Sequence, residues 1–408
     1  MTTATVGVDS QLPGVTRAQA LLRGPFLIWT ALLLNVLTFG ALPMVVPIPH
    51  AIGQMACQGA LPLAILLGLL ANPGGLVRPS FFITMLTIFA IVSFMVSIHS
   101  QFMVGSTYRA VRLLAFVLVL WLLTAWWGRS DLILLRCHLL CLRVLVVSVL
   151  IGVLLAPGKA FSYGGRLTGA IYPLPPTQVA HYSAVLLGCT IVLWFCGATS
   201  GRTALLTLLG VGAALIGTHT RTALLGLVVG LVVAGASLFL GHARVRRTSA
   251  MVGVLVVTTV TLFAPLIVDW LLRGQSRQDA TGLTGRTQVW SAVIAMRRSR
   301  PEELFGSGLS NKSFNGLAID SNWVATYLDS GWFGLFVDAA LLITLLLLAI
   351  MHRRGLRRAI ALFLVTYCLI ASFTETGLGD ASPYLMELFL AGSVLAAPAG
   401  VPGRRVPT

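Results

Sequence analysis

The chain has 408 residues, of which 57% are hydrophobic and only 10% are charged, and its mean hydropathy is +0.91. Soluble domains carry about 25% charged residues, so this composition excludes a soluble globular protein and indicates an integral membrane protein. The formal net charge is +16, but the basic residues are scattered over many short segments without interleaved aromatics, so we expect no nucleic-acid partner.

Apolar runs of about 20 residues, the length that crosses roughly 30 Å of hydrocarbon, recur along the whole chain. They predict an all-α, polytopic membrane protein that forms one domain over residues 1–408. The pair at 203–218 and 222–240 is separated by a short polar segment, which fits either a sharp reversal or a broken helix. We expect twelve spans, at about 26–46, 51–70, 80–98, 109–127, 135–155, 178–198, 203–218, 222–240, 251–270, 331–351, 359–377 and 384–399.

Charge bias sets the expected orientation of these spans. With the N-terminus inside, every predicted inner segment carries at least one arginine, which predicts that both termini are cytoplasmic. The predicted outer side is also basic, with Arg109 and Arg112 at a helix start and a large outer loop, 271–330, between the ninth and tenth spans. An anionic substrate met at that face is the most economical explanation. The basic residues of this loop are Arg273, Arg277, Arg286, Arg297, Arg298, Arg300 and Lys312.

Part of the outer loop has helical spacing. Val289, Val293 and Met296 fall on one face of a helix that runs over residues 285–300. This pattern predicts a helix that lies in the membrane interface and ends at Pro301.

Two polar motifs precede that loop on the predicted outer side. Residues 164–169 form a glycine-rich loop whose single charge is Arg166, and a plain turn with one anchoring arginine is the simpler interpretation. Residues 218–222 place Arg221 beside His219 and three threonines. These side chains offer several donors to a phosphate, although an arginine at a helix boundary also acts as an interfacial anchor.

A third motif is spread over the outer loop and the start of the tenth span. Arg286 and Trp290 belong to a G-R-x-x-x-W segment, and a G-x-G follows at 306–308. Asp320 and Ser321 form a polar dipeptide, and eleven residues after Asp320 a G-x-x-G-L segment begins at Gly331.

Together these motifs resemble the O-antigen ligase and polymerase family of membrane glycosyltransferases. The resemblance covers about residues 160–350 and includes the G-R-L-x-G loop around Arg166 and the T-R-T-A helix start at Arg221. Ligases of this family usually have a His-Asn pair where this chain has Asp320-Ser321. The departure favours a polysaccharide polymerase over a ligase and weakens the case for a histidine base.

The resemblance implies an enzyme of the bacterial cytoplasmic membrane that works in exopolysaccharide biosynthesis without a metal or a cofactor. Its donor would be a glycan joined through a diphosphate to a polyprenol such as undecaprenol. Its acceptor would be a saccharide, or a lipid or other terminal acceptor if the chain is a ligase. The implied partners are membrane lipids and other proteins of polysaccharide assembly, a chain-length regulator among them.

The resemblance also implies roles for individual residues. Arg221 and Arg286 would bind the diphosphate and neutralise the leaving group, with Arg166 as a third candidate. Asp320 occupies the position of the proton acceptor, but it also fits a group that orients the acceptor or caps the next helix. His219 is a weaker second candidate for a substrate-binding or basic role.

Other classes of protein remain open from the sequence. Twelve spans also suit a polytopic transporter, but we find neither paired half-repeats nor a series of intramembrane acids. A glycosyltransferase that uses polyprenyl-phosphate sugars is disfavoured because the predicted first outer loop, 45–51, contains no acid. A membrane scaffold without enzymatic activity is the remaining alternative.

Overall fold

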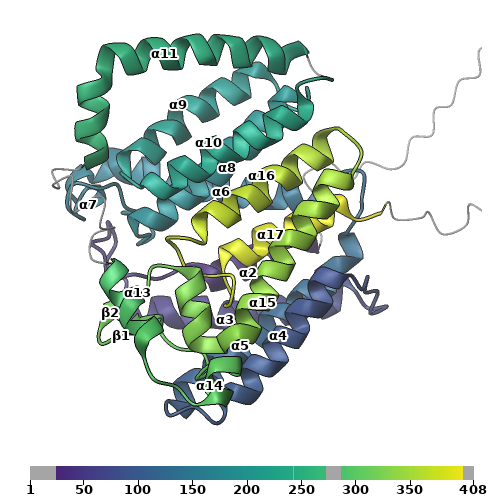
Figure 1. Cartoon of the computed structure of the whole chain (residues 1–408). Helices are drawn as coiled ribbons and strands as arrows, with labels where there is room; N and C mark the ends of the chain where they lie inside the picture. The colour runs from purple at the N-terminus through teal and green to yellow at the C-terminus, as the bar shows by residue number, and fades with distance from the viewer. Residues whose placement is uncertain (1–23, 242, 273–285, 398–408) are drawn as a thin grey trace, which may run out of the picture.

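The computed structural model describes residues 24–241, 243–272 and 286–397 (Figure 1). Arg273 and Arg277 of the predicted outer loop lie outside the described residues. Helices dominate the described residues, as the sequence predicts, because a helix satisfies its own backbone hydrogen bonds in lipid. One short antiparallel hairpin joins β1 (Ser313–Phe314) to β2 (Leu317–Ala318).

Each predicted span overlaps a helix. These helices are α2 (Pro25–Val36), α3 (His50–Ala71), α4 (Phe81–Ser97), α5 (Met103–Leu123), α6 (Ile133–Leu155), α8 (Pro176–Phe195), α9 (Gly201–Gly217), α10 (Arg221–Leu238), α11 (Ala243–Leu272), α15 (Asn322–Met351), α16 (Leu356–Ala371) and α17 (Pro383–Leu395). Shorter elements connect them: η1 (Thr124–Trp126), α7 (Pro157–Ala160), α13 (Arg286–Ala295) and α14 (Arg300–Phe305).

Six of the described helices are long and apolar enough to cross a membrane, namely α3, α5, α6, α8, α10 and α15. Helices α2, α4, α9 and α17 are apolar but shorter. The chain is therefore a polytopic membrane protein in its architecture. The count of twelve crossings and the placement of the large loop outside the membrane stay predictions.

Helices α8, α16 and α17 lie at the centre of the bundle. Most of their side chains are buried, and α16 packs against α8, α10, α15 and α17. Gly188 of α8 faces the ring of Phe363 so closely that an added Cβ would collide with it. The connection from α16 to α17, residues 372–382, therefore projects from the middle of the molecule (Figure 1).

The segment between α9 and α10 is a reversal rather than a broken helix. Both helices pack along α8, which two consecutive helices of this length achieve only by folding back. His219 adopts a left-handed backbone conformation at the turn, with φ of 52°.

Several helix ends differ from the predicted ones. Helix α5 begins at Met103, so Arg109 and Arg112 lie inside the helix and not at its start. Helix α15 begins at Asn322, and Gly331, where the predicted span starts, is instead a kink with φ of 61°. Helix α16 ends at Ala371 and leaves the following polar residues in a loop.

The helix predicted over 285–300 is also corrected. Helix α13 ends at Ala295, and Pro301 lies in the first turn of α14 instead of ending a helix. Ser299 caps α14 and forms a capping box with Glu302, an arrangement in which a proline at the first helical positions is favourable. Val289 and Val293 do share one buried face, which packs in a small apolar cluster with Ile319, Ala325 and Leu328.

Candidate functional site

Arg286 and Asp320 form an ion pair. The Arg286 Nε and the Asp320 Oδ2 lie 3.1 Å apart, and the two side chains are 30% and 42% exposed. Arg286 is the first residue of α13, and Asp320 precedes α15. The N-cap of α15 is Ser321, so the helix-capping interpretation of Asp320 is wrong. The structure therefore brings two separate parts of the third sequence motif into contact.

Arg166 joins the first two motifs. Its Nε donates to the Thr218 carbonyl oxygen at 2.9 Å, and its Nη2 donates to the Thr220 hydroxyl oxygen at 3.1 Å. Its guanidinium also lies 5.9 Å from the centre of the Tyr163 ring. Because Thr220 is the N-cap of α10, Arg166 is held beside Arg221, the first residue of that helix.

The loop between α16 and α17 meets both of these groups. The hydroxyl oxygens of Thr222 and Thr374 lie 2.5 Å apart, which ties the loop to the start of α10. On the other side, Asn322 Oδ1 accepts hydrogen bonds from the backbone N–H groups of Gly377 at 3.2 Å and Leu378 at 2.8 Å. The loop is thus fixed between α10 and α15.

This loop presents Glu375, a residue that is not among the candidates predicted from the sequence. Burial, and next to it the charge of Asp320, raise the pKa of Glu375 from its ordinary value of 4.5 to about 7. Arg286, His181 and Arg166 oppose that rise. A carboxyl group with this pKa accepts and releases a proton near neutral pH.

The sequence does not single out Glu375, because its position falls within a predicted membrane span. The predicted span 359–377 absorbed the polar run Thr374-Glu375-Thr376. Placing a carboxylate inside a membrane span costs free energy unless the side chain faces protein or water. The acidic residue within the predicted span is therefore the feature of the sequence that points to a functional role.

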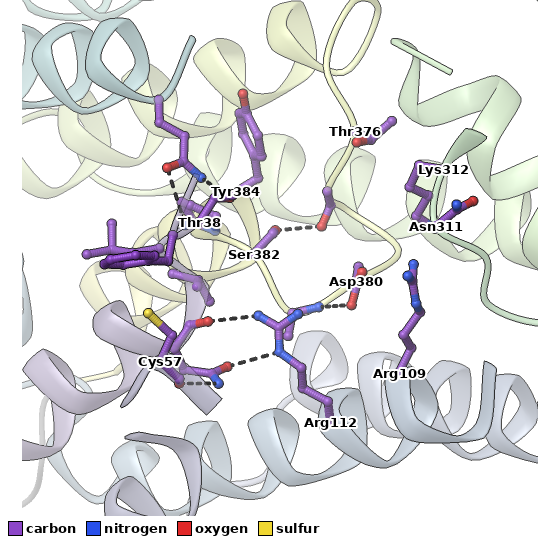
Figure 2. A pocket seen from close by; sticks show the side chains of 18 of the residues that line it. Thr38, Cys57, Arg109, Arg112, Asn311, Lys312, Thr376, Asp380, Ser382 and Tyr384 are labelled. Atoms are coloured by element: carbon purple, nitrogen blue, oxygen red, sulfur yellow. Dashed lines mark hydrogen bonds between the residues drawn. The ribbon is translucent and has the colours of Figure 1, made fainter. Parts of the chain in front are cut away.

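A cavity of about 710 Å³ lies next to this cluster. It is lined by α3, α5, α8, the segment between α2 and α3, residues 311–312 and the α16–α17 loop (Figure 2). Glu375 is part of its wall, whereas the predicted residues Arg166, Arg221, Arg286 and Asp320 are not. Glu375 is therefore a carboxylate that belongs to both the charged cluster and the cavity.

The remaining predicted candidates are dispersed. His219 is partly exposed at the α9–α10 turn, and its assigned role stays a prediction. Arg298 donates to the Tyr327 carbonyl oxygen at 2.9 Å and stacks on the Tyr327 ring. Lys312 pairs with Asp329. Arg298 and Lys312 thus contact protein groups and stabilise the loop locally.

The helical architecture and the charged cluster define a polytopic membrane protein whose arginines and carboxylates gather at the ends of several helices. Residues 203–339 match the family model described as O-antigen ligase, which confirms the resemblance in the sequence motifs. The match includes Arg221, Arg286 and Asp320, and it excludes Arg166 and Glu375. No curated protein matched the chain.

The family and the apolar helices together indicate a membrane glycosyltransferase-like protein of a bacterial inner membrane. The family further implies a polyprenyl-linked glycan and an acceptor as substrates.

Proposed function

We propose that this chain transfers a glycan from a polyprenyl diphosphate to a saccharide acceptor and so lengthens a polysaccharide at the outer face of the cytoplasmic membrane. The observation that carries the proposal is the meeting of separate motifs around Glu375. The Arg286–Asp320 pair and the Arg166 contacts to the α9–α10 turn come from distant parts of the sequence. All of these charged groups act on the pKa of Glu375.

The donor half of the reaction needs fixed positive charge. Breaking the bond between the sugar and the diphosphate builds negative charge on a leaving group that is already anionic. Arg166, Arg286 and Arg221 supply guanidinium groups, and Arg221 lies at the N-terminus of α10, where backbone N–H groups also favour an anion. Such charge stabilises the transition state without reorganisation.

The acceptor half needs a proton acceptor, and Glu375 suits this role better than Asp320. Asp320 is already paired with Arg286, so its carboxylate is less available to an acceptor hydroxyl, whereas Glu375 lies in the wall of the cavity. We assign to Asp320 the orientation of Arg286 and to Glu375 the deprotonation of the acceptor. The acceptor oxygen then bonds to the anomeric carbon, its proton moves to Glu375, and the polyprenyl diphosphate leaves with the electrons of the broken bond.

Ligation to a lipid or other terminal acceptor is the second candidate, because the matching family model carries the description O-antigen ligase. The two reactions share the donor chemistry and differ in the acceptor. The Asp320-Ser321 dipeptide favours the polymerase.

The test uses the full chain in lipid nanodiscs with an undecaprenyl-diphosphate oligosaccharide. A polymerase lengthens the saccharide and releases undecaprenyl diphosphate, whereas a ligase moves a glycan of unchanged length to an added lipid acceptor. Arg286→Gln should lower the rate about 100-fold or more. Arg297→Gln is the matched control, because Arg297 is an exposed arginine in the same segment. A transporter would change only the side of the membrane on which the intact donor is found.

A further inference from the structure

Two arginines within the length of α5 have side chains that face the cavity. Gly105, Tyr108, Arg109 and Arg112 recur at the spacing of one helical face, and all four line the cavity. Figure 2 shows Arg109 and Arg112 reaching from this helix into the pocket. An arginine within an apolar membrane helix costs free energy, so one that faces a cavity indicates a functional site.

The partners of these arginines are neutral. Arg109 donates to the Ser310 carbonyl oxygen. Arg112 donates from Nε to Asn35 Oδ1 at 3.3 Å and from Nη2 to the Asn35 carbonyl oxygen at 2.9 Å. Within the described part of the chain, neither guanidinium has a carboxylate at ion-pair distance. Their hydrogen-bond partners are thus backbone carbonyls and an amide, and Asp380 is a carboxylate of the same cavity (Figure 2) that forms no ion pair with either of them.

The other charged groups of the cavity are differently placed. Lys312 is paired with Asp329; burial opposes its charge, but Asp329 and Asp380 outweigh burial and raise the pKa of Lys312. Asp380 Oδ1 accepts a hydrogen bond from the Ala381 N–H at 2.7 Å. Arg109 and Arg112 thus remain as the cationic groups that a ligand can neutralise.

The rest of the lining suits a sugar. Gln54 and Gln58 lie one turn apart on α3, and both are exposed side chains at the cavity. Their amides can donate to and accept from sugar hydroxyls, and the exposed Tyr108 ring adds an apolar face. The volume of about 710 Å³ falls within the roughly 300–1,000 Å³ typical of small-molecule sites.

We propose that this cavity binds an acidic saccharide, with its carboxylate against Arg109 and Arg112, and that this saccharide is the acceptor of the transfer reaction. A planar guanidinium matches a carboxylate through two parallel hydrogen bonds. Glu375, in the same wall, then lies on the side of the acceptor that faces the donor cluster. The role as acceptor rests on the proposed function, whereas the binding of an acidic saccharide does not.

The experiment measures binding to the full chain in nanodiscs, without any donor. The probes are an oligosaccharide that ends in a glucuronic acid and its neutral counterpart that ends in glucose. The wild-type chain should bind the acidic probe about tenfold or more tightly than the neutral one, and Arg109→Gln/Arg112→Gln should remove this difference. Equal affinity for both probes, or an unchanged preference in the variant, would overturn the proposal.

Further variants separate binding from folding and from the donor site. Asp380→Asn keeps the acceptor atom of its hydrogen bond and removes a negative charge, so binding of the acidic probe should tighten severalfold, which a misfolded protein cannot imitate. Arg109→Gln alone spares the contacts of Arg112 with Asn35. Arg286→Gln should leave probe binding unchanged while it abolishes transfer, so a failure of the proposed function is distinguished from a failure of this one.

Inorganic pyrophosphate is the competing probe. If pyrophosphate displaces the acidic saccharide, and if Arg109→Gln/Arg112→Gln rather than Arg286→Gln removes pyrophosphate binding, the cavity is a phosphate site and the saccharide proposal is wrong. If pyrophosphate binding depends on Arg286, the two sites are separate, as proposed.

Discussion

Glu375 and Asp320 are both carboxylates near arginines, but they differ in their contacts. Asp320 makes a direct ion pair with Arg286. Glu375 has a pKa raised to about 7. Proton transfer is fastest when the pKa of the base lies near the working pH. The division of labour between them can therefore be read from activity as a function of pH.

The first prediction concerns that pH dependence. The deprotonated form of Glu375 is the active base, so kcat/KM, which reports the protein before the donor binds, should rise with pH through about 7 and level off above it. Glu375→Gln should lower kcat about 100-fold or more and leave a profile without this step. A Glu375→Gln enzyme that keeps the same rise near neutral pH would show that another group is the base.

The second prediction concerns Asp320. Because the pair with Arg286 is partly exposed to solvent, its contribution to the free energy of unfolding should be only about 0–1 kcal/mol. Asp320→Ala should therefore leave the melting temperature nearly unchanged while it lowers kcat through a misoriented Arg286. The pH-dependent rise of activity should persist in this variant but move to lower pH, because the charge of Asp320 raises the pKa of Glu375. Loss of that rise would instead identify Asp320 as the base.

Residues that carry motifs could be found from the sequence, and residues that act through position could not. Arg221, Arg286 and Asp320 stand in short patterns, and the ion pair between two of them accords with those patterns. Glu375 belongs to no pattern, since its chemistry depends on burial and on charges brought from other helices. Arg109 and Arg112 were noticed for their charge but were placed at a helix start, which hid the cavity they face.

At the scale of elements, two glycines allow the end of α14 to pack closely against the kink of α15. Gly306 and Gly331 both have positive φ, of 78° and 61°. A Cβ on Gly331 would lie 2.5 Å from the Glu303 carbonyl oxygen. The kink directs the first turns of α15, which carry Asn322, toward the α16–α17 loop.

The third prediction follows from this packing. Gly331→Ala should lower the free energy of unfolding by at least about 1–3 kcal/mol, because it adds a clash to an unfavourable backbone conformation. Gly212→Ala on α9 is the control, since an added Cβ there meets nothing within 4 Å. Thermal melting in detergent compares the two, and equal melting temperatures would contradict the close contact.

The fourth prediction concerns Asn322, which holds the α16–α17 loop. Asn322→Ala leaves the N–H groups of Gly377 and Leu378 without their acceptor, at a cost of about 1–3 kcal/mol. The displaced loop should also shift the pH of half-maximal activity, because the surroundings of Glu375 change. Reduced stability with an unchanged pH profile would mean that Asn322 stabilises the fold without positioning Glu375.

Helix ends were the least predictable elements, for a physical reason. Apolar content marks where a chain can lie in hydrocarbon, but a helix ends where its backbone groups find other partners. Helix α16 ends six residues before the predicted limit, because Thr374 and Gly377 bond to α10 and α15 instead. Pro301 follows a capping serine and so begins a helix.

At the scale of the whole molecule, the predicted orientation is open to a direct test, which is the fifth prediction. Single cysteines at Asn315 and Arg354, both exposed, should lie on opposite sides of the membrane in a cysteine-free background. A membrane-impermeant thiol reagent added to intact cells should label Asn315→Cys and spare Arg354→Cys. The reverse pattern would invert the topology and place the charged cluster at the cytoplasmic face.

The position of Glu375 between the arginine cluster and the cavity also links the basicity of Glu375 to binding of the donor. Arg286 and Arg166 lower the pKa of Glu375. An arriving diphosphate would neutralise them, so the carboxylate would become a stronger base only while a donor is loaded. After the leaving group departs, the restored positive charge would help to expel the captured proton. Binding of the donor would thus raise the basicity of Glu375, and departure of the leaving group would lower it again in each catalytic cycle.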